Sequence, residues 1–138
     1  MGTPRQLFDH EKLNVYGKSL EFVAGATAIL ESVPKSMAVH SQLDRSSTSI
    51  PLNIAEGTGK FTAPDRCRYY DTARGSALEC AASLDVLVAK RVLRAEEITG
   101  GKELLRPVVA MLVGLIKSVA PDRVFDGTTD YGSGASES

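Results

Sequence analysis

The residues of this chain that could do chemistry are two histidines, two cysteines and a few serines placed near charged side chains. His10 and His40 are isolated, and neither belongs to a His-x-x-His or Glu-x-x-His pair of the kind that builds a helical metal site. Neither histidine is placed by the sequence to act as a base for Ser49 or Ser76. We therefore predict no metal site, no catalytic residue and no cofactor.

Cys67 and Cys80 are thirteen residues apart, which corresponds to about 20 Å along a helix, so they cannot form a disulfide within one helix. Both fall on apolar helix faces, a position that favours inert core thiols over nucleophiles. Gly57-Thr58-Gly59-Lys60 resembles a fragment of a phosphate-binding loop, but it follows a helical pattern rather than a strand. We interpret it as a helix end and predict that the protein is not an enzyme.

The charged residues offer two alternatives. Arg45, Glu56, Arg74 and Glu79 are predicted to be partly buried and ion-paired, because an isolated buried charge is costly. A second group is basic and lies beside Tyr69 and Tyr70, which is a pattern suited to phosphate contacts; it consists of Lys60, Arg66, Arg68 and Arg74. The whole chain has 16 basic and 17 acidic residues, so a solvated face is the other interpretation of this group.

Helical periodicity predicts four segments that would position these side chains. The first runs from an N-cap at Asp9 to Pro34 with two apolar stripes, and the second runs from residues 36–39 to Gly57 or Gly59. The third begins at Thr62 or Ala63 and reaches about Lys90. A turn containing Glu96, Glu97, Gly100 and Gly101 then precedes a fourth helix over residues 104–119. We predict one domain over residues 1–119 and a disordered polar tail over 120–138.

The stretch from Ser49 to Gly57 places a proline inside the second helix. Pro51 has no backbone N–H, so the helix is predicted to kink and the carbonyl of Ser47 to lose its partner. The amide of Asn53 is predicted to satisfy a carbonyl freed by Pro51 or to bond a neighbouring subunit.

Together these patterns predict an all-α protein, an antiparallel up-down-up-down four-helix bundle with a kinked second helix. Second apolar stripes on the first, third and fourth helices favour a symmetric homo-oligomer, and the alternative is a monomer with a wide core. The longest apolar stretch, residues 107–116, is too short to span a bilayer, and we predict a cytoplasmic protein.

The motifs Gln42 to Arg45, Ser49 to Gly57 and Ala73 to Glu79 resemble, in order and spacing, the signature helices of a bacterial four-helix-bundle family, first known as proteins encoded in intervening sequences of large-subunit ribosomal RNA genes. The resemblance implies a left-handed bundle assembled as a ring-like homopentamer, without assigned enzymatic activity. It also implies a structural and assembly signature made of Arg45, Ser49, Pro51, Asn53, Glu56, Gly57, Arg74, Gly75, Ser76 and Glu79.

A relative with the same fold is the accessory variability protein of diversity-generating retroelements, a positively charged pentameric barrel that binds nucleic acid and a reverse transcriptase. Two hypotheses follow for this chain. The first is a non-enzymatic homo-oligomeric scaffold or interaction protein whose partner is itself or another protein. The second is a nucleic-acid-binding accessory protein that uses Lys60, Arg66, Arg68 and Arg74.

Overall fold

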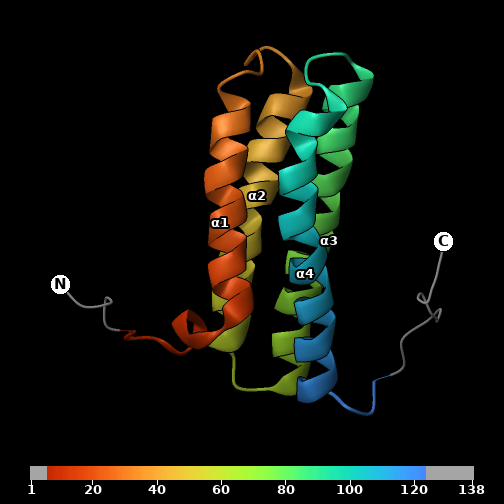
Figure 1. The fold of residues 1–138 in the computed structure, drawn as a ribbon. Helices are drawn as coiled ribbons and strands as arrows, with labels where there is room; N and C mark the ends of the chain where they lie inside the picture. The colour runs from red at the N-terminus through yellow and green to blue at the C-terminus, as the bar shows by residue number, and fades with distance from the viewer. Residues whose placement is uncertain (1–5, 124–138) are drawn as a thin grey trace.

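The structure is a computed structural model that describes residues 6–123. A short 3₁₀ helix, η1 (Asp9–Lys12), precedes four α-helices: α1 (Asn14–Leu30), α2 (Ala38–Thr58), α3 (Ala63–Ala89) and α4 (Ala95–Val119). Consecutive helices pack against each other and run in opposite directions, and α1 packs against α4 (Figure 1). Over residues 6–123 the two diagonal helix pairs have no Cα atoms within 8 Å of each other. The chain is therefore all-α and arranged as a four-helix bundle, as the sequence predicts.

The first helix begins later than its predicted cap. Asp9 opens η1 instead, and the extended backbone of Leu13 separates η1 from α1. The reason is local: the Glu11 carboxylate accepts hydrogen bonds from the backbone N–H groups of Leu7 (2.8 Å) and Phe8 (2.6 Å), which closes a separate turn. These two hydrogen bonds hold the pKa of Glu11 below its usual value.

The second and third helices follow the predicted pattern closely. α2 continues through Pro51, and its predicted apolar side is buried: Leu43, Ser47, Ile50, Ile54 and Gly57. α3 starts after Thr62, whose hydroxyl oxygen accepts a hydrogen bond from the backbone N–H of Asp65 at 3.2 Å. This cap leaves the missing N–H of Pro64 in the first turn, where it costs little.

The fourth helix is longer than predicted, and the predicted turn over Glu96 to Gly101 is wrong. α4 begins at Ala95 because Glu97 accepts a hydrogen bond from the backbone N–H of Arg94 at 2.7 Å and Ile98 is buried against the core. The connection is instead residues 90–94, where Arg91 adopts a positive φ of 61°.

The core lies along the bundle axis and is mainly aliphatic, with Phe22 and Tyr70 as its buried aromatic side chains. Its largest fully buried side chains come from all four helices, among them Phe22, Ile50, Leu84 and Leu112. Of the two stripes predicted on the first helix, the one containing Val15, Ser19, Phe22 and Ala26 is buried, whereas Leu20 of the other stripe is 44% exposed. A single copy therefore leaves apolar helix surface uncovered.

The predicted disordered tail lies outside the described residues except for residues 120–123, which follow α4 as a short turn. Within residues 6–123 there is no helix with the length and apolar character that crossing a membrane requires.

Candidate functional site

Gly57 on α2 packs closely against the two tyrosines at the start of α3. A Cβ atom at position 57 would lie 2.9 Å from the Cβ of Tyr69 and 3.0 Å from Cε1 of Tyr70. The Tyr70 and Thr58 hydroxyls are hydrogen-bonded at 2.8 Å, and Thr58 also donates to the carbonyl of Ile54. Gly57 therefore sets the distance between α2 and α3, the most extensively packed helix pair.

Two helical turns before Gly57, a small polar network joins the same two helices. The Asn53 amide donates to both the carbonyl and the hydroxyl oxygen of Ser49, each at 2.8 Å, and the Ser76 hydroxyl donates to the Ser49 hydroxyl at 2.8 Å. The carbonyl that Asn53 satisfies is therefore that of Ser49 and not that of Ser47, which Pro51 leaves without a partner in the helix. Three of the predicted signature residues, Ser49, Asn53 and Ser76, therefore form a hydrogen-bonded network that links α2 to α3.

A buried thiol lies one turn further along the same interface. Cys80 donates a hydrogen bond to the Ser46 hydroxyl at 3.2 Å, and its side chain is fully buried. Burial raises the pKa of the Cys80 thiol to about 11, while the hydrogen bond with Ser46 acts in the opposite direction. Such a thiol is protonated at neutral pH and has little thiolate available for nucleophilic chemistry.

The predicted burial and pairing of four charged residues is wrong in most of its parts. Arg45, Glu56 and Glu79 are exposed, and the ion pair that Glu56 makes is with Lys60, at 3.1 Å. Arg74 is half-buried, and its Nε is buried without a hydrogen-bond partner. The four charges do not meet, because helical spacing distributes them around two helices at different heights.

Three of the four residues in the predicted basic group lie close together, around Tyr69. The Lys60 ammonium and the Arg68 guanidinium each lie 5.1 Å from the centroid of the Tyr69 ring, and Arg66 Nε donates to the Lys60 carbonyl at 2.7 Å. Within residues 6–123, no hydrogen bond or ion pair joins Arg74 to these three residues. We call Lys60, Arg66, Arg68 and Tyr69 the basic cluster.

Acidic neighbours partly neutralise the basic cluster. Glu56 pairs with Lys60, and this contact, followed by the nearby Tyr69, raises the pKa of the Lys60 ammonium. Asp65 lies 3.5 Å from the Arg68 guanidinium. All of these groups are near the surface, so a phosphate would compete with the two carboxylates for the cations.

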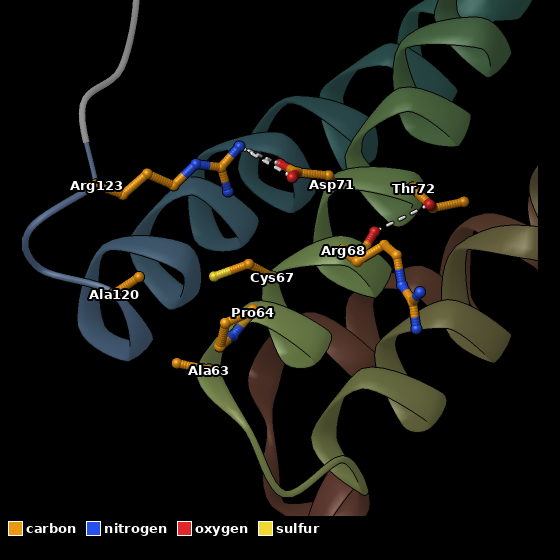
Figure 2. A pocket seen from close by; sticks show the side chains of 8 residues that line it. All are labelled: Ala63, Pro64, Cys67, Arg68, Asp71, Thr72, Ala120 and Arg123. Atoms are coloured by element: carbon orange, nitrogen blue, oxygen red, sulfur yellow. Dashed lines mark hydrogen bonds and ion pairs between the residues drawn. The ribbon is translucent and has the colours of Figure 1, made fainter.

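A shallow pocket opens beside the basic cluster, between the start of α3 and the end of α4. Its volume is about 660 Å³, and eight residues line it (Figure 2): Ala63, Pro64, Cys67, Arg68, Asp71, Thr72, Ala120 and Arg123. Arg123 Nη2 donates to both Asp71 carboxylate oxygens, at 2.9 and 3.1 Å, and this contact raises the pKa of the Arg123 guanidinium. The pocket has an apolar floor and a charged rim, and its carboxylate is already paired.

One conspicuous residue was missed by sequence reasoning. Phe61, in the turn between α2 and α3, is 98% exposed. A signal existed, since an aromatic residue stands between the end of α2 at Thr58 and the cap of α3 at Thr62. No three potential metal-ligating side chains gather anywhere in residues 6–123.

These features define a class of protein: a small four-helix bundle in which a few polar side chains join α2 to α3. The model of the family described as 23S rRNA-intervening sequence protein matches residues 11–114. The chain therefore belongs to the 23S rRNA-intervening sequence protein family, as its motifs predict.

A solved structure supports the same fold. The chain is similar to a protein of unknown function from the S23 ribosomal protein family of Bacteroides thetaiotaomicron VPI-5482, with a TM-score of 0.70 and 24% sequence identity. The similarity covers 75% of this chain and 98% of the solved one. No curated protein matches the chain.

Proposed function

We propose that the protein is a non-enzymatic scaffold that self-associates, as a ring-like homopentamer, and offers its assembled surface to other molecules. The observation that carries this proposal is apolar surface on ordered helices that one copy does not cover. Leu52 on α2 is 63% exposed, and Leu20 on α1 and Leu78 on α3 are also exposed. Covering such side chains in a second copy is favourable by about 25 cal/mol for each Å² of apolar surface buried.

Glycines inside the helices support close approach by another chain. Among residues 6–123, a Cβ atom added to Gly17, Gly25, Gly75 or Gly114 would meet no atom within 4 Å apart from the chain neighbours and helix backbone next to that glycine. Each costs up to about 1 kcal/mol of helix stability relative to alanine. No contact in the described part of one copy offsets that cost, whereas a helix of a second copy packed against these positions would.

The chemistry of the described residues favours a scaffold over an enzyme. Cys80 is a buried, protonated thiol, and the pocket of Figure 2 presents guanidinium groups with a carboxylate already paired to one of them. Neither arrangement places a nucleophile beside a free base.

Mass measurement tests self-association directly. Light scattering after gel filtration, repeated over a hundredfold range of protein concentration, is expected to give five times the 14.7 kDa mass of the chain. A mass of one chain at every concentration would overturn the proposal.

The second candidate is a nucleic-acid-binding accessory protein, and the basic cluster with the exposed Phe61 favours it. Cations and aromatic faces together suit single-stranded nucleic acid, where bases stack and phosphates pair. The test is electrophoretic binding to DNA and RNA, single- and double-stranded, over a salt series. Arg68→Gln should weaken binding and reduce its salt dependence, whereas the matched exposed variant Arg45→Gln should not. Absence of binding at low salt would remove this candidate.

A further inference from the structure

Arg68 joins the basic cluster and the pocket of Figure 2 into one surface, which we call the cluster–pocket surface. The Arg68 side chain lines the pocket, and its guanidinium lies 5.1 Å from the centroid of the Tyr69 ring, pointing away from Arg123 (Figure 2). The Lys60 ammonium lies at the same distance from that ring. A bound chain can therefore run from the pocket across Arg68 to Lys60.

Cations outnumber carboxylates on the cluster–pocket surface. Within the described residues they are Lys60, Arg66, Arg68 and Arg123 against Glu56, Asp65 and Asp71. Each carboxylate lies within ion-pair distance of one cation, whereas Arg66 makes no ion pair among residues 6–123 and donates from Nε to the Lys60 carbonyl. The remaining positive charge favours an anionic occupant.

The apolar parts of the same surface suit flat rings. The pocket floor is formed by Ala63, Pro64, Cys67 and Ala120. The pocket volume of about 660 Å³ falls within the roughly 300–1,000 Å³ that is usual for ligand pockets. Phe61 stands two residues before Ala63 and is 98% exposed, on a turn held by the hydrogen bond from Lys60 N to Gly57 O and by the Thr62 cap. An exposed ring on an ordered turn is a platform on which a base can stack at little entropic cost.

We propose that the cluster–pocket surface binds single-stranded nucleic acid, with one unpaired base in the pocket, phosphates on Arg68 and Lys60, and another base stacked on Phe61. The inference rests on the second candidate function and names how that site selects its ligand. A base in a duplex is covered on both faces by its neighbours in the stack, so only an unpaired base can lie against the apolar floor. An acidic peptide would pair with the same cations, but its carboxylate side chains carry no flat ring for the floor or for Phe61.

Abasic strands separate base insertion from phosphate binding. Fluorescence anisotropy of the unaltered chain is measured at low salt with labelled single strands of DNA and RNA, with an abasic strand of the same length, and with the duplexes. The base-containing single strands should bind about tenfold more tightly than the abasic strand or the duplexes. Equal affinity for the abasic strand overturns base insertion and leaves nucleic-acid binding in place, whereas no binding of any probe overturns both. Displacement by polyglutamate as effectively as by unlabelled strand would assign the surface to acidic peptides instead.

Filling the pocket tests where the base lies. Ala63→Leu should weaken binding of the base-containing strand about tenfold and leave the abasic strand unaffected, because only the base needs the floor. Ala95→Leu is the matched control, since Ala63 and Ala95 are each the first residue of a helix, and it should change neither affinity. Circular dichroism verifies that the helices persist. Unchanged affinity of a folded Ala63→Leu would overturn the assignment of the pocket.

Phe61→Ala provides a variant that cannot disturb the core, because its side chain is almost fully exposed. It should also weaken binding of the base-containing strand about tenfold without changing binding of the abasic strand. Phe8→Ala, at another exposed phenylalanine, is the matched control and should bind as the unaltered chain does. Equal affinity of Phe61→Ala and Phe8→Ala for the base-containing strand would overturn the stacking on Phe61.

Discussion

A Cβ atom on residue 57 would lie 2.9 Å from the Cβ of Tyr69, so α2 and α3 approach each other at a distance that glycine alone permits at this position. Gly57→Ala should lower the free energy of unfolding by about 1–2 kcal/mol, because the cost of overpacking exceeds the gain in helix propensity. Urea unfolding measures this difference. Gly100→Ala, which meets no atom within 4 Å, is the control and should be neutral or stabilising; equal effects of the two variants would contradict the argument.

The Ser49–Ser76 hydrogen bond predicts an energetic coupling between α2 and α3. Ser49→Ala and Ser76→Ala should each destabilise the fold, and the double variant should be less destabilised than the sum of the two by about 0.5–1.5 kcal/mol. A double-mutant cycle by chemical denaturation gives this number. If the effects of the two substitutions on the free energy of unfolding were strictly additive, the 2.8 Å hydrogen bond would contribute nothing to the coupling of α2 and α3.

The Cys80 thiol predicts a stability loss at alkaline pH. Its pKa rises from 9.0 to about 11 on folding, so the unfolded chain loses this proton first as the pH increases. The stabilisation is fully present below pH 9 and is lost between about pH 9 and pH 11. Urea midpoints over that range should fall more steeply for the unaltered chain than for Cys80→Ala, whose other titrating groups are the same. Parallel pH profiles for the two chains would exclude the effect.

The end of α3 predicts a stabilising substitution. Arg91 has a positive φ of 61°, and the hydrogen bond from Val92 N to Leu87 O closes the helix around it. Glycine adopts this backbone without the Cβ penalty, so Arg91→Gly should raise the free energy of unfolding by about 0.5–1 kcal/mol. Thermal unfolding should show a higher midpoint, whereas Lys90→Gly, at the neighbouring position with negative φ, should show a lower one.

Much of the fold could be predicted from local sequence. Thr62 before Ala63-Pro64 specified the start of α3, and the spacing of Leu43, Ile50 and Ile54 specified the buried side of α2. These predictions succeed because capping chemistry and helical periodicity depend on residues close in the chain. The start of α4 failed for a related reason: two adjacent glycines suggested a turn, while Glu97 and the buried Ile98 provided the stronger local signal.

The candidate site depended on contacts that periodicity does not encode. Lys60 and Glu56 are four residues apart, so their ion pair could be predicted from helical spacing. The hydrogen bonds of Ser49 with Ser76 and of Arg123 with Asp71 join residues that are tens of positions apart in the sequence. Their register is fixed by how closely α2, α3 and α4 pack. The expected network of Arg45, Glu56, Arg74 and Glu79 failed because charge type alone does not say which helix face meets a neighbour.

By itself, the sequence determined that this chain forms four amphipathic helices, where most of them begin and end, and which family it belongs to, because those properties reside in residue type and short-range spacing. The tertiary structure alone decided that Gly57 sets the α2–α3 distance, that Phe61 is exposed and that a pocket lies beside it. The physical reason is that exposure and cavity shape arise from the packing of side chains that are distant in the chain. Small differences in side-chain size change how helices pack, and so decide which of their surfaces come into contact.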